Sequence, residues 1–226
     1  MTELNRGLSG KRGRPSVVLS ALQGRLRITS VEQGRSAEPA AEERTTDSPF
    51  IYLGLDMPPA PLFKDSQGGK VIAQVPLYEL LRKYDGRSWS ESVTAGVIAR
   101  RRFRLTRLPG YLVLHLNRFT KNSFFEEKNS TIVTFPVKNL ELKDLVFPAL
   151  TPLTPEDELR EVVQLFGGEE LVSRLPAASD RDALLSLAGT AAAAVCTKYD
   201  LVANICHDSS GAASGGDVTA ITADER

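Results

Sequence analysis

Two cysteines and two histidines are the residues of this chain whose types suit nucleophilic or metal chemistry. They are Cys196, Cys206, His115 and His207. A cysteine protease needs a thiolate, whose pKa is lowered at a helix N-terminus, and a histidine base that an Asn or Asp holds in place. Cys206 and His207 are adjacent in an apolar stretch that predicts a core strand, where neighbouring side chains point to opposite faces. We therefore expect no dyad from this pair and predict that Cys206 is a buried thiol.

The same four residues do not form a metal-binding pattern. The chain has no Cys-x-x-Cys pair, and its two histidines are isolated in the sequence. Because structural zinc sites use such ligands at short spacing, we predict no metal site and no cofactor. Two cysteines are too few for a disulfide framework, which is typical of a reducing compartment. His115 lies in an apolar strand pattern and is predicted to be a hydrogen-bonded core histidine.

Charge is balanced over the whole chain, but basic residues cluster at two places. The 226 residues include 28 basic and 28 acidic side chains, which indicates no general affinity for nucleic acid. Residues 11–15 contain an Arg-Gly-Arg-Pro core like that of minor-groove AT hooks, and residues 100–107 alternate arginines with Phe103 and Leu105. For the first cluster we favour a solvated basic loop. For the second we favour an edge or outer strand whose arginines face water.

The elements that position these residues centre on the middle of the chain. Residues 111–116 are almost continuously apolar and predict a central strand, and residues 131–135 predict a second strand that Pro136 ends. The polar connection between them carries Phe124 and Phe125. This pattern predicts a buried hairpin or near-hairpin. Paired aromatic residues on a polar loop often anchor an interface, whereas the alternative is that one or both fold back onto the sheet.

Local patterns predict further elements on either side of this hairpin. They are a short helix from residue 17 to 22, strands at 25–29, 50–55 and 201–206, and a helix at 75–84 that Asp85 and Gly86 end. Amphipathic fragments and an alanine-rich run between residues 148 and 196 predict one or two more helices. No apolar run approaches the roughly 20 residues that a membrane-spanning helix requires.

Three short motifs in the central stretch are shared with a known family. They are Leu-Pro-x-Tyr-Leu at residues 108–112, Leu-x-Arg-Phe at 116–119 and Ile-Val-x-Phe-Pro at 132–136. Together they resemble the palm region of the ubiquitin-specific proteases. The longer string from Arg118 to Asn129 is similar to the splicing-associated branch of that family, which associates with the tri-snRNP. The resemblance implies an α+β, papain-like fold, of which this chain holds the palm and finger portion with a central, largely antiparallel sheet.

This resemblance divides the chain into three parts. Residues 1–15 form a polar basic tail, residues 16–147 and 197–226 form an incomplete domain similar to the ubiquitin-specific proteases, and residues 148–196 form a low-complexity or helical insertion. Active relatives usually carry zinc-binding cysteine pairs in the finger region, which this chain lacks, as does the splicing-associated branch. The sequence leaves open whether the chain is a fragment or a shortened paralogue, and whether the insertion is ordered.

The resemblance also implies that the catalytic residues of the family are missing here. The family's cysteine box precedes the strands described above, and neither cysteine of this chain matches it. Where the family has Gly-His-Tyr with its catalytic histidine, this chain has Gly216-Asp217-Val218, so Asp217 stands at the position of the base. The splicing-associated branch lacks this histidine as well. We therefore expect a pseudoenzyme without catalytic residues, and we name Arg118, Phe124 and Phe125 as candidate interaction residues.

Three functional hypotheses result. The leading one is a catalytically inactive protein that acts in pre-mRNA splicing in the nucleus, through contacts with tri-snRNP and spliceosomal proteins. Such a protein binds ubiquitin weakly or not at all, has no membrane partner and does not contact nucleic acid directly. The alternative is a deubiquitinating cysteine protease, a ubiquitin thioesterase or isopeptidase, represented by an incomplete chain. The third is a nucleic-acid-binding adaptor that uses residues 12–15 and 100–107.

Overall fold

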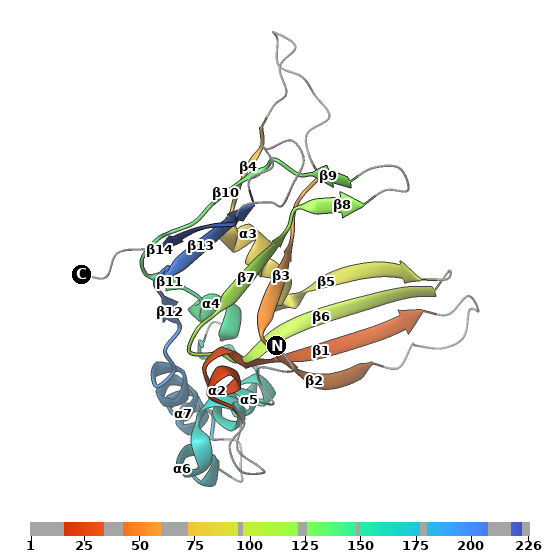
Figure 1. Cartoon of the computed structure of the whole chain (residues 1–226). Coiled ribbons are helices and arrows are strands. Elements are labelled where there is room, and N and C mark those ends of the chain that lie inside the picture. Colours follow the sequence, from red (N-terminus) through yellow and green to blue (C-terminus); the bar gives the residue numbers. More distant parts are fainter. Residues whose placement is uncertain are drawn as a thin grey trace.

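A four-stranded antiparallel sheet dominates the computed structural model, which describes residues 16–33, 43–59, 72–94, 97–121, 126–147, 150–176, 180–207 and 218–222. Its strand order is β2-β1-β6-β5 (Figure 1). The strands are β1 (Gly24–Gln33), β2 (Arg44–Phe50), β5 (Asp85–Thr94) and β6 (Val97–Arg107). Because β6 lies between β1 and β5, the prediction of an edge or outer strand at residues 100–107 is wrong.

The arginines of β6 are accommodated inside the sheet because residues beside them supply acidic and aromatic partners. Arg100 Nε lies 3.0 Å from Glu91 Oε1, and Arg102 Nη2 lies 3.2 Å from Glu43 Oε1. Both guanidinium groups also lie over the ring of Trp89, at 5.8 and 5.0 Å from its centre. The Trp89 ring attracts both guanidinium groups through cation–π contacts, and the aliphatic parts of the two arginine side chains cover the sheet while the charged groups reach water.

Two further strand pairs are parallel and join segments that are distant in the sequence. Strand β3 (Tyr52–Asp56) pairs with β7 (Val113–Asn117), and β4 (Gln74–Pro76) pairs with β10 (Ile132–Thr134). The predicted strands at 111–116 and 131–135 therefore exist at nearly the predicted places, but they do not form a hairpin with each other. The prediction of a central position for the first is also wrong, since β7 belongs to a two-stranded sheet among the described residues.

Three antiparallel ribbons complete the described strands. They are β8 (Phe119–Lys121) with β9 (Glu126–Lys128), β11 (Leu140–Glu141) with β12 (Lys198–Tyr199), and β13 (Ala203–His207) with β14 (Val218–Thr222). The predicted strand at 201–206 corresponds to β13, but the prediction of a core strand is wrong, since Ala203, Ile205 and Cys206 are exposed and β13 pairs only with β14 among the described strands.

Helices gather around the sheet and confirm the α+β class. They are α2 (Val17–Leu22), α3 (Leu77–Leu81), the 3₁₀ helix η1 (Arg82–Tyr84), α4 (Lys143–Val146), α5 (Glu156–Phe166), α6 (Gly168–Ser173) and α7 (Arg181–Ala193). The predicted helix at 17–22 is confirmed, and Ser16 Oγ caps it by accepting a hydrogen bond from Leu19 N at 3.2 Å. The predicted helix at 75–84 is confirmed from residue 77, and Gly86 follows its end with a φ of 72° that suits glycine.

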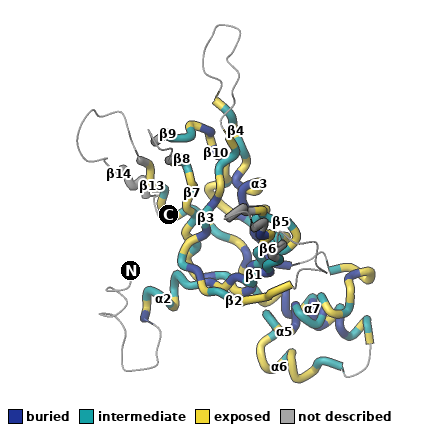
Figure 2. Tube along the Cα trace, turned by 90° about the vertical axis from the view of Figure 1, so that its right-hand side faces the viewer, coloured by how far each residue is buried: buried dark blue, intermediate teal, exposed yellow. Residues whose placement is uncertain are grey.

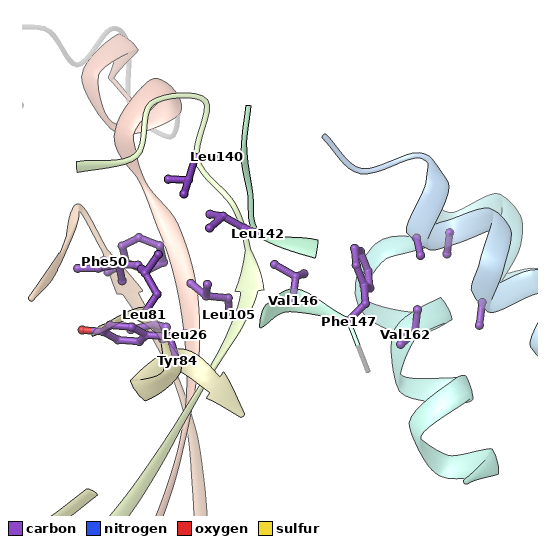
Figure 3. Packing of buried hydrophobic residues seen from close by; sticks show 14 of the residues in the cluster. Leu26, Phe50, Leu81, Tyr84, Leu105, Leu140, Leu142, Val146, Phe147 and Val162 are labelled. Atoms are coloured by element: carbon purple, nitrogen blue, oxygen red, sulfur yellow. The ribbon is translucent and has the colours of Figure 1, made fainter. Parts of the chain in front are cut away.

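One apolar core connects the large sheet with α3, α4, α5 and α7 (Figure 3). Leu105 of β6 and Leu81 of α3 are each 0% exposed and lie on the sheet side of this core. Phe147 follows α4 and contacts Phe166 of α5, with ring centres 4.7 Å apart. Figure 2 shows that burial is concentrated along such contacts, whereas β2 and α6 are largely exposed.

The described residues between 150 and 196 pack onto the sheet through α5, against which α7 packs. The described part of this segment contains three helices, where one or two were predicted. Glu161 of α5 accepts hydrogen bonds from Arg27 of β1 through Oε1 and from Arg104 of β6 through Oε2. Leu184 of α7 is 0% exposed and belongs to the same core as the sheet. The segment is therefore ordered over its described residues and integral to the packing.

Candidate protein-interaction site

The β8–β9 hairpin presents the connection that carries the predicted aromatic anchors. Its register pairs Phe119 with Lys128 and Lys121 with Glu126, so residues 122–125 connect the two strands. Phe124 and Phe125 belong to that connection and lie outside the described residues. Figure 1 places the hairpin at one end of the molecule, away from the helices α5 to α7. Whether the two phenylalanines are exposed therefore stays a prediction.

Arg118 holds the base of this hairpin together. Its Nη1 donates hydrogen bonds to the backbone oxygens of Asn129 and Thr131, at 3.2 and 2.5 Å. Asn129 in turn donates from its side chain to Pro58 O at 2.7 Å and accepts from Thr131 N at 2.9 Å. These bonds tie the hairpin base to the chain that follows β3. Arg118 is half-buried, so its guanidinium acts in this site as a positioning group; its role in partner contact stays a prediction.

A chain of polar side chains runs along the exposed face of β3 and β7, next to this base. His115 Nδ1 lies 2.9 Å from Asn117 Oδ1, and Asn117 Nδ2 donates to Asp56 Oδ1 at 2.8 Å. The other oxygen of Asp56 pairs with Lys83 Nζ. Since the amide oxygen of Asn117 only accepts, this geometry requires a proton on Nδ1 of His115. The parallel register, which sets Asp56 opposite Asn117, creates this arrangement.

The electrostatics of this chain of contacts favour an ionised carboxylate. Burial opposes the charged form of Asp56, but hydrogen bonds from Lys83 and Asn117 and the charge of Lys83 outweigh it, so the pKa of Asp56 is lowered. Next to it, burial and the charge of Asp56 raise the pKa of Tyr84 to about 12. The hydroxyl of Tyr84 donates to Gly54 O at 2.7 Å. These shifts in pKa keep Asp56 ionised and Tyr84 protonated at neutral pH.

A shallow pocket adjoins this network. Its volume is about 340 Å³. It is lined by Asp56, Met57, Pro58, Val75, Glu79, Leu80, Lys83 and Ser90. Asp56 and Lys83 of the polar chain therefore line the same pocket as Pro58, whose carbonyl oxygen anchors the hairpin base. A small pocket with polar edges suits contact with a side chain of a protein partner.

His115, Cys196 and Cys206 all lie on exposed surfaces. The prediction that His115 is a core histidine is wrong: its side chain is exposed, contacting Tyr52 at 5.9 Å between ring centres as well as Asn117. The prediction that Cys206 is buried is also wrong, because its side chain is exposed on the two-stranded β13–β14 ribbon. Cys196 is exposed as well. Among the described residues, no hydroxyl or thiol side chain is hydrogen-bonded to His115.

Asp217 lies outside the described residues, and the side chain of His207 is not described either. Within the described part of the chain, no cluster of three His, Cys, Asp or Glu side chains is arranged to hold a metal ion. No described helix is both long and apolar enough to cross a bilayer.

Asp56, Lys83 and Asn117 could not be identified from the sequence as members of a site. Their pairing depends on β3 and β7 lying side by side, and η1 packing beside them, which no local pattern specifies. The only sequence signal was a polar residue at the end of each of two apolar strands, Asp56 and Asn117, a placement that is common in sheets.

Comparisons with known proteins identify relatives over most of the chain. The family model described as "Ubiquitin carboxyl-terminal hydrolase" matches residues 1–226. "Ubiquitin carboxyl-terminal hydrolase 39" from Homo sapiens is 38% identical over 156 residues, covering 64% of this chain and 28% of the human protein. "Probable mRNA-splicing protein ubp10" from Schizosaccharomyces pombe is 33% identical over 202 residues, covering 86% and 32%. "Pre-mRNA-splicing factor SAD1" from Saccharomyces cerevisiae is 30% identical over 122 residues, covering 53% and 26%. The chain thus spans less than a third of the length of these three relatives.

Proposed function

The chain belongs to the ubiquitin carboxyl-terminal hydrolase family, and from this premise we propose that it is a catalytically inactive member that acts in pre-mRNA splicing. It works in the nucleus through contacts with proteins of the tri-snRNP and the spliceosome, and it binds ubiquitin weakly or not at all. Membership in the family also bears out the papain-like fold that the motifs at residues 108–136 imply.

The observation that carries the proposal is the similarity to relatives named for splicing. The protein named "Probable mRNA-splicing protein ubp10" aligns with 86% of this chain at 33% identity, and the "Pre-mRNA-splicing factor SAD1" aligns with 53% at 30% identity. The alignment with the former extends over most of the described elements, so the shared features are those of the palm and finger portion rather than of one short motif.

Inactivity is proposed from the residue at the base position. Asp217 replaces the histidine that the family motif places between Gly216 and the next residue. An aspartate is ionised at neutral pH and is a far weaker base than a neutral imidazole, because its ordinary pKa is about 3.9 against about 6.5 for histidine. His115 does not replace it, since its described contacts are with Asn117 and Tyr52.

Partner contact is proposed at the β8–β9 hairpin. The Arg118 bonds to Asn129 and Thr131 fix both ends of the hairpin on a rigid base. A connection that starts and ends on fixed backbone loses less conformational entropy when a partner binds. Phe124 and Phe125 in that connection are the aromatic anchors of the proposed interface.

The test is affinity purification of the tagged full-length protein from nuclear extract, with mass spectrometry of proteins, sequencing of co-purified RNA and a ubiquitin titration. We expect tri-snRNP proteins and small nuclear RNAs, and no saturable ubiquitin binding. A Phe124→Ser/Phe125→Ser variant should lose these partners. The matched control is Val202→Ser/Ile205→Ser, which changes two apolar residues that are 60% and 70% exposed elsewhere. Loss of partners in both variants, or purification of ubiquitin without splicing components, contradicts the proposal.

The second candidate is an active deubiquitinase, which the name of the human relative, a hydrolase, favours. Release of a coumarin dye from the ubiquitin C-terminus measures this activity directly. The full-length protein should show no hydrolysis above background, and neither should an Asp217→His variant if the nucleophile is also missing. Hydrolysis by the unmodified full-length protein would establish the enzyme and end the proposal of inactivity.

A further inference from the structure

A second recess is lined by the end of the large sheet, the C-terminal turn of α5 and the residues that follow α7, elements that lie away from the β8–β9 hairpin (Figure 1). This groove has a volume of about 690 Å³. It is lined by Arg25, Asp47, Thr106, Arg107, Leu108, Pro109, Gly110, Gln164, Leu165, Phe166, Val195 and Cys196. Its walls therefore come from three sources: the end of the sheet, the turn that precedes β7, and the helical segment between residues 150 and 196.

Two neighbouring arginines give the groove a positive charge. Arg25 of β1 and Arg107 of β6 are cross-strand partners, and both are exposed. Neither forms a salt bridge with another described residue. The one carboxylate in the lining, Asp47, already pairs with Arg27 Nε at 3.0 Å. Because like charges on paired strands repel, an anion bound between Arg25 and Arg107 removes an unfavourable interaction.

Much of the remaining lining of the groove is apolar. Leu108, Leu165, Phe166 and Val195 line it, and each of these side chains is only partly buried. Phe166 is fixed in position by the ring of Phe147, at 4.7 Å between ring centres. A groove that combines apolar side chains with a pair of arginines matches a ligand that carries an apolar side chain next to carboxylates. Arginine is well suited to this role, since its planar guanidinium binds carboxylates in a bidentate manner.

A nucleic acid fits this surface less well. The described lining contains two cations and one carboxylate, whereas nucleic-acid grooves contact a series of phosphates with several Lys or Arg side chains. We propose that the groove binds an acidic peptide segment of a protein partner, with an apolar side chain against Leu108 and Phe166 and carboxylates on Arg25 and Arg107. This site is separate from the hairpin surface, so it stands or falls independently of the proposed role in splicing.

Cys196 provides a reporter for occupancy of the groove. It lines the groove and is exposed, and the chain has only one other cysteine, Cys206. In a Cys206→Ser background of the full 226-residue chain, the rate of reaction with Ellman's reagent therefore reports access to Cys196 alone. The probe is a synthetic peptide in which Asp and Glu flank a central Leu-Phe pair. Its two matched controls replace the acids by Asn and Gln, or the Leu-Phe pair by Ser-Ser.

The expected result is saturable protection of Cys196 by the acidic Leu-Phe peptide and by neither control. Protection should weaken with added salt, because surface charges are screened. Arg25→Glu/Arg107→Glu should raise the apparent Kd at least about tenfold, equivalent to about 1.4 kcal/mol. Arg87→Glu/Arg174→Glu, a matched reversal at two exposed arginines outside the groove, should leave the Kd unchanged within about twofold.

Several outcomes overturn the proposal. They are absence of protection by the acidic Leu-Phe peptide, equal protection by the Asn and Gln peptide, equal loss of affinity in the control variant, and protection by single-stranded RNA but not by peptide. If the charge-reversal variant does not fold, Arg25→Gln/Arg107→Gln replaces it. Whichever arginine variant is used, the comparison of the acidic peptide with its two control peptides on the Cys206→Ser chain tests the proposal.

Discussion

Removal of the charge on Glu161 should destabilise the whole domain, because one carboxylate joins α5 to two strands of the sheet. Glu161 accepts from Arg27 and Arg104, and the side chains of the three residues are 25%, 27% and 19% exposed. Glu161→Gln preserves the shape of the side chain and removes its charge. Arg27 then retains Asp47 as a partner, whereas Arg104 retains no carboxylate partner among the described residues.

The burial of these groups sets the size of the effect. Removal of one partner from a fully buried ion pair costs roughly 3–5 kcal/mol, because the remaining charge is left without compensation. Water reaches about a fifth of the Arg104 side chain, which reduces the cost, so we expect a loss of about 2–3 kcal/mol in the free energy of unfolding. For a chain of this size, that corresponds to a decrease in Tm of roughly 5–10 °C.

Urea denaturation followed by circular dichroism measures this loss, since urea does not screen charges as guanidinium does. Glu169→Gln on α6 is the matched control, because Glu169 is exposed and should change stability by no more than about 0.5 kcal/mol. Replacement of all three charged residues, as Arg27→Met/Arg104→Met/Glu161→Leu, should recover much of the stability. If Glu161→Gln unfolds within about 0.5 kcal/mol of the unmodified chain, the helical segment does not depend on this contact and the reasoning is refuted.

Three further perturbations test the site and the core. Arg118→Ala should cost about 1–3 kcal/mol, because it leaves backbone oxygens such as that of Thr131 without a donor, and hydrogen exchange should increase at residues 126–131. Hydrogen bonds to Asp56 outweigh its burial and lower its pKa from 3.8, so the ionised carboxylate stabilises the fold above pH 3.8 and this stabilisation is lost as the pH falls through the lowered pKa. Asp56→Asn should therefore reduce the urea midpoint at neutral pH, and its difference from the unmodified chain should shrink in acid. Leu105→Ala, at a position that is 0% exposed, should cost about 2–5 kcal/mol in urea denaturation, and a cost below about 1 kcal/mol would show that the core is not packed there.

The local elements could be predicted from the sequence because their causes are local. The apolar spacing of residues 17–22 and of Leu77, Leu80 and Leu81 is a property of neighbouring residues, and the helices it predicts are present. The same applies to the turn after Tyr84, where Gly86 adopts a positive φ. Each of these signals specifies backbone geometry within one or two turns.

The partners of the strands could not be predicted because they are set at a distance. Residues 111–116 and 131–135 pair in parallel with strands that begin 61 and 58 residues earlier, counted from Val113 to Tyr52 and from Ile132 to Gln74. An apolar run shows that a strand has a buried face, but it does not identify the neighbouring strand. The wrong predictions for His115 and Cys206 have the same origin, because exposure depends on which layers cover a strand.

The candidate site likewise contains one residue that the sequence identified and others that it could not. Arg118 was identified from a family motif, and its position at the hairpin base gives it a structural role that the motif does not state. The polar chain from His115 to Lys83 depends on the β3–β7 pairing and was not identified. The two arginines of the groove, Arg25 and Arg107, become neighbours only through the β1–β6 register.

The central claim is that this family member acts in splicing by contact and without catalysis. Intron retention measures it most directly, in cells of the source organism that are depleted of the full-length protein and then supplied with variants. We predict that depletion increases intron retention, that the unmodified protein and Asp217→Ala restore splicing equally, and that Phe124→Ser/Phe125→Ser does not. Normal splicing after depletion, or failure of Asp217→Ala while Phe124→Ser/Phe125→Ser restores splicing, would contradict the account.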